Sequence, residues 1–191
     1  SDAPSLPYRR RQGERKSTVH WGQRKLMLCE IEFLTKYAAL SPSYTCIYAG
    51  AAPGTHIPFL SMLFPQVSFI LIDPSDFAIE ATERITIRQE FMTDAIAEEY
   101  ASLCFEHILF ISDVRSVDYR AVDRTMLEET IKQDMAWQQD WYSIIKPLAA
   151  MLKFRLPWDE QSSTYLDGDV YLPVWGPQST TECRLVIDRA K

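Results

Sequence analysis

Short apolar runs that favour strands alternate with helical stretches along this chain, and this alternation limits the fold more than any other feature. The runs at 44–49, 67–72 and 107–112 have the composition of strands buried on both faces of a sheet. Helical periodicity or capping signals fall around them, over 22–40, from the turn at 50–55 to about residue 64, over 93–103 and over 123–146. The pattern predicts an α/β fold, with a mostly parallel sheet flanked by helices on both faces.

Further strand predictions complete this sheet. Residues 85–92 and 149–156 are expected to be strands, and short strands near Val170 and over 183–187 are expected to pair as a hairpin. The length of 191 residues suits one domain of ordinary size. We therefore predict one domain over 21–191, preceded by a basic arm over 1–20 that lacks periodicity.

Composition and charge exclude several classes of protein. Hydrophobic residues make up 47% of the chain and charged residues 24%, which is typical of a globular domain. No apolar run approaches the roughly 18 residues that a membrane helix needs, so no membrane partner is expected. The formal charge of −6 argues against a general nucleic-acid binder, but it allows an enzyme with a local basic groove. The cysteines and histidines are never spaced as a metal clip, so we predict no metal site.

Three of the predicted strands end in features that suit a ligand site, namely the turn Gly50–Thr55, Asp73 and Asp113. Open α/β sheets bind ligands at this edge. The turn has the spacing G-x-x-x-G with a proline, whereas a dinucleotide-binding loop has G-x-G-x-x-G to seat a pyrophosphate. It therefore favours a nucleoside-type cofactor such as S-adenosylmethionine, whose ribose hydroxyls Asp73 would bind. A nicotinamide cofactor and a tight turn without a ligand are the alternatives.

Five sequence blocks, in one fixed order, point to a known family. The blocks are Gly22–Leu26, Ile47–His56, Ile111–Ser116, Leu152–Trp158 and Thr181–Leu185. They resemble the poxvirus family of cap-specific mRNA 2′-O-methyltransferases that double as stimulatory subunits of poly(A) polymerase. The resemblance covers most of residues 20–188. It implies a Rossmann-like S-adenosylmethionine-dependent methyltransferase fold and an enzyme that acts on capped mRNA, releasing S-adenosylhomocysteine.

The resemblance also implies an intact catalytic set. The Lys-Asp-Lys-Glu tetrad of the wider FtsJ-type family falls on Lys25, Asp113, Lys153 and Glu182. A ribose 2′-hydroxyl is a poor nucleophile at neutral pH, so the reaction needs groups that orient it and remove its proton. We expect Lys153 to activate the hydroxyl, Asp113 and Glu182 to position it, and Lys25 to complete the charge network. Taken singly, each of these residues has an ordinary structural role as the alternative.

The same resemblance assigns the cofactor contacts. They fall on Gln23, Tyr48, Gly50, Ala52, Pro53, Gly54, Asp73 and Asp113. The poxvirus relatives have Asp-Gly-Arg after the second strand, where this chain has Asp73-Pro74-Ser75. The contact made by that arginine is therefore expected to be missing or supplied by another residue.

Candidate RNA contacts follow from the same alignment. Trp158 takes the position of an aromatic residue that stacks on the methylated guanine of the cap, and Glu160 lies just beyond it. Core packing is the alternative for Trp158, and a tyrosine expected near Ser179 is absent. Arg115 and the basic arm would contact phosphates.

Two other functions stay open. The first is a regulatory subunit of a poly(A) polymerase or capping complex that keeps the fold without catalysis, and the second is a nicotinamide oxidoreductase. The expected partners are capped mRNA and a polymerase or capping-enzyme subunit. The resemblance implies a viral protein in the cytoplasm, in a viral factory or a virion, or a nuclear protein if the chain is cellular.

Overall fold

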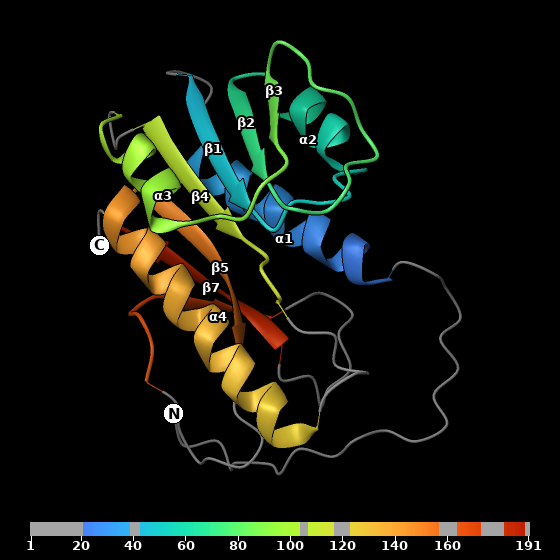
Figure 1. The fold of residues 1–191 in the computed structure, drawn as a ribbon. Coiled ribbons are helices and arrows are strands. Elements are labelled where there is room, and N and C mark those ends of the chain that lie inside the picture. The colour runs from blue at the N-terminus through green and yellow to red at the C-terminus, as the bar shows by residue number, and fades with distance from the viewer. Residues whose placement is uncertain are drawn as a thin grey trace.

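A computed structural model describes residues 21–38, 43–103, 107–116, 123–156, 164–172 and 182–189 of the chain. Within these ranges the strands are β1 (Tyr44–Ala49), β2 (Val67–Ile72), β3 (Ile85–Arg88), β4 (Ile108–Ser112), β5 (Ala149–Arg155), β6 (Asp169–Tyr171) and β7 (Glu182–Asp188). The helices are α1 (Trp21–Tyr37), α2 (Ile57–Leu63), α3 (Asp94–Ala101) and α4 (Arg124–Ile145). The strands form one sheet with the order β3-β2-β1-β4-β5-β7-β6 (Figure 1).

The sheet is parallel from β3 to β5 and antiparallel from β5 to β6. The register pairs Ile47 of β1 with Ile70 of β2 and with Phe110 of β4. β7 runs antiparallel to β5, with Lys153 opposite Arg184, and β6 pairs with β7. The central strands β1, β4 and β5 consist largely of buried residues, as expected for a sheet covered on both faces.

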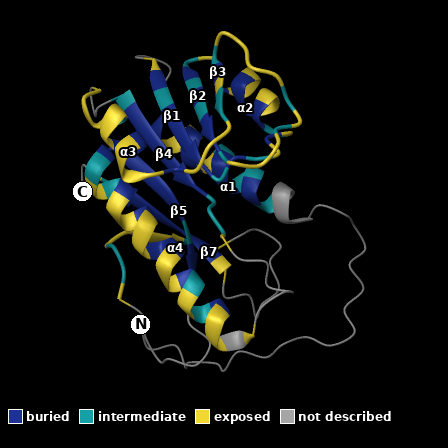
Figure 2. Cartoon of the chain, viewed as in Figure 1, coloured by how far each residue is buried: buried dark blue, intermediate teal, exposed yellow. Residues whose placement is uncertain are grey.

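Two apolar cores lie on opposite faces of the sheet because successive strand residues point to opposite sides. α1 and α2 cover one face, where Phe33 and Leu60 pack against alternate residues of the strands. α3 and α4 cover the other, where Ile96 and Trp141 pack against the remaining residues. Figure 2 shows the strands buried between the helices, whose outer faces are exposed.

The predicted α/β fold is confirmed, with most elements close to their expected ranges. Thr93 caps α3 as predicted, since its hydroxyl accepts a hydrogen bond from the Ile96 N–H at 3.3 Å. The third strand is shorter than predicted, because it ends at Arg88 instead of residue 92. Its pairing partner β2 ends at Ile72, opposite Arg88, so the chain beyond has no strand to pair with.

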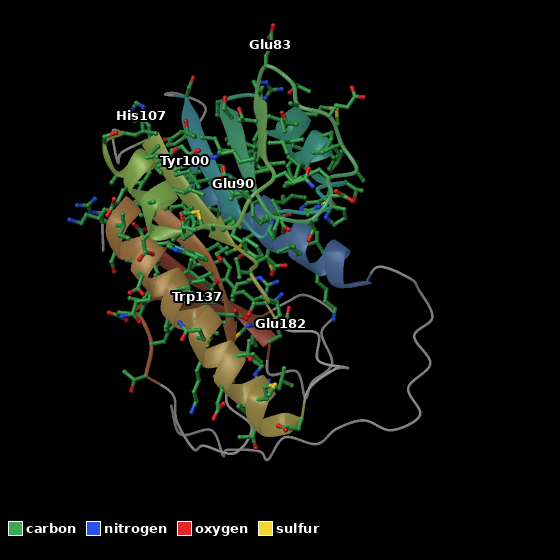
Figure 3. All side chains as sticks on the ribbon, viewed as in Figure 1. Glu83, Glu90, Tyr100, His107, Trp137 and Glu182 are labelled. Carbon is green, nitrogen blue, oxygen red and sulfur yellow. The ribbon has the colours of Figure 1, made fainter. Side chains whose placement is uncertain are left out.

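The strand order brings the predicted site residues to one edge. It reverses between β1 and β4, and open α/β sheets bind ligands at the carboxyl ends of such strands. Because β7 is antiparallel, its first residue, Glu182, lies at this edge too, next to the end of β5 (Figure 3). Within the ranges that the structure describes, no helix combines the length and the apolar composition that a membrane crossing requires.

Candidate functional site

The turn after β1 is shaped by two glycines in the left-handed conformation. Gly50 has φ of 77° and Gly54 has φ of 72°. A Cβ atom on Gly50 would lie 2.8 Å from the backbone nitrogen of Val114 and 2.9 Å from the carbonyl carbon of Asp113. Glycine is therefore required at position 50 because the chain leaving β4 passes directly against the turn.

Asp73, at the end of β2, holds the same turn in place. One oxygen of its carboxylate accepts a hydrogen bond from the Ala52 N–H at 3.2 Å, and the other accepts from the Ser75 N–H at 2.9 Å. Ala52 is half-buried, whereas Pro53 is exposed. The carboxylate thus links the ends of β1 and β2 while it remains at the edge of a cavity.

A cavity of about 870 Å³ opens at this edge of the sheet. Its lining residues come from the ends of β1, β2 and β4, from the segment before α3 and its first turn, and from α4: Gly50, Ile72, Asp73, Pro74, Ser75, Phe91, Met92, Thr93, Asp94, Ala95, Val114, Arg115, Ser116, Trp137 and Trp141. The volume falls in the range of small-molecule and cofactor sites. The walls are apolar and aromatic with two carboxylates, and the cavity's arginine, Arg115, is already paired with Asp134. Such a lining suits a nucleoside better than a phosphate.

A chain of four charged side chains lies next to the turn. The Nζ atom of Lys153 is 3.2 Å from Oδ1 of Asp113, and Nη2 of Arg184 donates to the same oxygen at 2.8 Å. The other terminal nitrogen of Arg184 donates to Oε1 of Glu182 at 3.1 Å. Lys153, Asp113, Arg184 and Glu182 therefore form one connected set that alternates in charge, and Figure 3 marks its outer end at Glu182.

Strand alternation explains why these side chains meet. Ala149 and Met151 of β5 and Val186 of β7 belong to the core under α1. Counting along each strand in steps of two places Lys153 and Arg184 on the same face of the sheet. The register sets the two opposite each other, and Asp113 enters between them from the end of β4.

Burial and neighbouring charges shift the pKa values of Arg184 and Glu182 in opposite directions. Burial alone would lower the pKa of Arg184, but the carboxylates of Asp113 and Glu182 outweigh it, so the pKa lies above its ordinary value. Partial burial would raise the pKa of Glu182, but Lys153 and Arg184 outweigh it and hold the pKa below its ordinary value. Both groups therefore stay charged near neutral pH.

The fourth member of the predicted tetrad, Lys25, lies in the first part of α1 and is half-buried. Its helix covers the face on which Lys153 and Arg184 lie. No residue within the described ranges pairs with its ammonium group. The structure therefore brings Asp113, Lys153 and Glu182 into one network, and the role of Lys25 stays a prediction.

Tyr48, a predicted cofactor contact, is fully buried beneath the turn. Its hydroxyl donates to Oε1 of Glu30 at 2.6 Å, and the ring Nε2 of His56 lies 3.0 Å from the same carboxylate. Burial alone would lower the pKa of His56, but its hydrogen bond to Glu30 and that charge raise it above the ordinary value. These three side chains tie α1 to both ends of the turn, and a cofactor contact by Tyr48 stays a prediction.

The remaining predicted residues are only partly described. Arg115 lines the cavity and lies 3.4 Å from the buried carboxylate of Asp134. Gln23 belongs to α1, but its side chain lies outside the described part of the chain, as do Trp158 and Glu160 altogether. The basic arm lies outside it as well.

Sequence reasoning missed Arg184 and the residues from α4 and the α3 segment that line the cavity. A signal for Arg184 existed, because it is a charged residue within the otherwise apolar run Cys183–Ile187. A buried arginine needs an anionic partner. The cavity residues Asp94 and Trp137 gave no such signal, because an acidic first turn and a helical apolar stripe are common in any helix.

The class of protein follows from the sheet order and the edge site. The C-terminal half of the sheet adds antiparallel β7 to the doubly wound order β3-β2-β1-β4-β5. A solved structure of VP4 from bluetongue virus, described as a multifunctional RNA-capping production line, superposes with a TM-score of 0.58 at 14% identity. The match covers 81% of this chain and 25% of that one. The fold is therefore the Rossmann-like α/β fold that the sequence predicts.

Sequence comparison then gives the family. The family model described as "Poly A polymerase regulatory subunit" matches residues 5–191, so the chain belongs to this family. The cap-specific mRNA (nucleoside-2′-O-)-methyltransferase of fowlpox virus is 32% identical over 179 residues, which are 86% of this chain and 57% of that protein. The protein of the same name from myxoma virus is 28% identical over 183 residues, which are 90% and 53%. The chain thus spans little more than half the length of these relatives.

Proposed function

We propose that this chain transfers a methyl group from S-adenosylmethionine to a ribose 2′-hydroxyl of capped mRNA, at the nucleotide next to the cap. The observation that carries the proposal is the network of Lys153, Asp113, Arg184 and Glu182 beside the glycine turn. A lysine held by the carboxylate of Asp113, which adjoins the cavity residues Gly50 and Val114, suits the methylation of a hydroxyl group. The names of the fowlpox and myxoma relatives supply the reaction and the substrate class.

The cavity residues fit the proposed cofactor. Gly50 would let the cofactor approach the backbone, Asp73 would accept from the ribose hydroxyls, and Asp94 would accept from the amino group of the adenine. When bound, S-adenosylmethionine supplies an activated methyl group on a positively charged sulfur. The acidic groups and the apolar walls of the cavity suit such a cation, and nothing in the turn is arranged to seat a pyrophosphate.

The protein's own residues would handle the proton of the substrate. In its neutral form, the amine of Lys153 would accept the proton of the 2′-hydroxyl as that oxygen takes the methyl group, and the electron pair of the broken carbon–sulfur bond would stay on the sulfur of the departing S-adenosylhomocysteine. Asp113 orients the lysine, and Arg184 shares the same carboxylate oxygen, which fixes Asp113 in turn. Glu182 completes the network at its exposed end. Holding both substrates in line would supply much of the remaining acceleration.

A second function, in complex with a poly(A) polymerase, is favoured by the family description. The regulatory and the catalytic functions are compatible, since the tetrad residues are all present in the sequence. A viral, cytoplasmic setting belongs to the same proposal, and it is supported by the viral organisms of the relatives.

Methyl transfer from labelled S-adenosylmethionine to short RNA, capped and uncapped, tests the proposal. We expect label in the capped RNA with the wild type and none with Lys153→Ala. Lys36→Ala is the matched control, because neither Lys36 nor its partner Asp169 lines the cavity or belongs to the charged network, so this variant should keep full activity. Melting curves in the same experiment should rise with S-adenosylhomocysteine and stay unchanged with NAD. Cofactor binding without any transfer would instead favour the regulatory function.

A further inference from the structure

Two buried polar residues of α4 face the strand ends that carry the charged network. Asp134 and Gln138 are 0% exposed, and they are four positions apart, which sets them on the same face of the helix. Neither belongs to the cofactor turn or to the tetrad. Buried amide and carboxylate groups are stable only with full hydrogen bonding, so their partners indicate their role.

Gln138 bonds the backbone of Lys153 in both directions. Its side-chain oxygen accepts from the Lys153 N–H at 3.1 Å, and its side-chain nitrogen donates to the Lys153 carbonyl at 3.2 Å. The pairing of β4 with β5 ends one residue earlier, at Ser112 and Leu152. The side-chain amide of Gln138 thus makes the two backbone hydrogen bonds with Lys153 beyond the point where the pairing with β4 ends.

Asp134 binds the segment that follows β4 and carries Arg115 and Ser116. Its carboxylate accepts from the hydroxyl of Ser116 at 2.6 Å and from the Ser116 N–H at 3.2 Å. Arg115 donates to it at 3.4 Å. These residues directly follow Asp113 and Val114, so the carboxylate fixes the segment that leaves β4 and lines the cavity.

We infer that Asp134 and Gln138 are positioning residues that set the separation of Asp113 and Lys153. The pairing of β4 with β5 stops before both residues, so no direct pairing of these two strands sets the separation. The sheet holds each residue only from its other side, through the bond from the Asp113 N–H to the Ala49 carbonyl and the pairing of Lys153 with Arg184. The expected effect on the reaction rate rests on the proposed methyl transfer. The expected effect on the backbone at Lys153 does not depend on it. A displaced lysine lowers the rate of proton removal without altering the cofactor cavity, to which Gln138 does not contribute.

The test replaces Gln138 by methionine, which has a similar length and no hydrogen-bonding amide. We expect kcat to fall about tenfold to a hundredfold. The KM for S-adenosylmethionine and the dissociation constant for S-adenosylhomocysteine should stay within about twofold. Gln138→Glu, which keeps an acceptor for the Lys153 N–H, should recover part of the rate. The matched control is Gln139→Met, the same change at the exposed neighbouring position, which should keep full activity.

A second readout does not depend on activity. Hydrogen exchange of the Lys153 amide, followed by NMR in protein labelled with ¹⁵N-lysine, should become about tenfold faster in Gln138→Met and stay unchanged in Gln139→Met. Unchanged kcat in an active Gln138→Met protein would overturn the inference. If the wild type transfers no methyl group, the proposed function fails. The exchange rate alone then decides whether Gln138 positions the backbone of Lys153. Protection of the Lys153 amide that survives in Gln138→Met would then refute it.

Discussion

Replacing Gly50 by alanine should destabilise the protein far more than the same change at Gly54. Both glycines have positive φ, so alanine at either position costs roughly 1–2 kcal/mol for the left-handed conformation. Their surroundings differ. The new methyl group at Gly50 would lie 2.8 Å from the backbone nitrogen of Val114, whereas at Gly54 it would meet the side chains of Ile79 and Phe77 at 3.2 and 3.3 Å.

The difference in surroundings sets the difference in stability. Side-chain ends at Gly54 can shift by a few tenths of an ångström, so the free energy of unfolding should fall by only about 1–2 kcal/mol there. At Gly50 the strand end itself must move, which adds about 1–3 kcal/mol of overpacking. We therefore expect a loss of about 3 kcal/mol for Gly50→Ala. At roughly 2–4 °C per kcal/mol for a domain of this size, Tm should fall by about 6–12 °C.

Urea titration and thermal melting of the two variants measure this difference, and calorimetry with S-adenosylhomocysteine measures its effect on the cavity. Gly50→Ala should also weaken the binding of S-adenosylhomocysteine, because Val114 of the displaced segment lines the cavity and Asp113 adjoins it. Equal and small losses of stability in the two variants would show that the chain leaving β4 does not lie against Gly50.

Three further predictions concern other parts of the chain. The pKa of His56 is raised in the folded state, so its pairing with Glu30 contributes its full stability at pH below the unfolded pKa of about 6.5. This contribution is lost as the pH rises through the folded pKa. The difference in unfolding free energy between the wild type and His56→Gln should therefore shrink with rising pH, and a constant difference would contradict the pairing. Arg184→Leu leaves Asp113 with one cation instead of two and should cost about 3 kcal/mol in urea titrations, while a loss below about 1 kcal/mol would show that the buried pair is not formed. Thr93→Ala removes the cap of α3 and should cost about 1 kcal/mol by thermal melting, whereas Thr93→Ser should be nearly neutral, and equal losses would argue against the cap.

The regular elements and the edge of the sheet that carries the site could be predicted from sequence because they depend on local patterns. Short, continuous apolar runs located the strands and helical spacing located the helices, and the topology of parallel sheets placed Gly50, Asp73 and Asp113 at one edge. The family resemblance added Lys153 and Glu182, which the structure joins to Asp113 in one network.

The side-chain pairings could not be predicted, because they join residues that lie far apart in the chain. Arg184 and Asp113 are separated by 71 positions, and no local period relates them. Glu30 occupies a position in the apolar stripe of α1, which alone signals that it is buried, but its partner Tyr48 becomes visible only once α1 lies on β1. Likewise, the shorter third strand depends on where its neighbour β2 ends.

If the acceptor is a ribose 2′-hydroxyl, an RNA without that hydroxyl should take no methyl group. Two capped RNAs are compared, identical except that the first transcribed nucleotide carries ribose in one and 2′-deoxyribose in the other. Transfer of labelled methyl groups is measured for each with the wild-type protein. We predict label in the ribose substrate, recovered as the 2′-O-methyl nucleoside, and none in the deoxyribose substrate. Equal labelling of both RNAs would contradict the account, because the methyl group would then go to a base or to the cap.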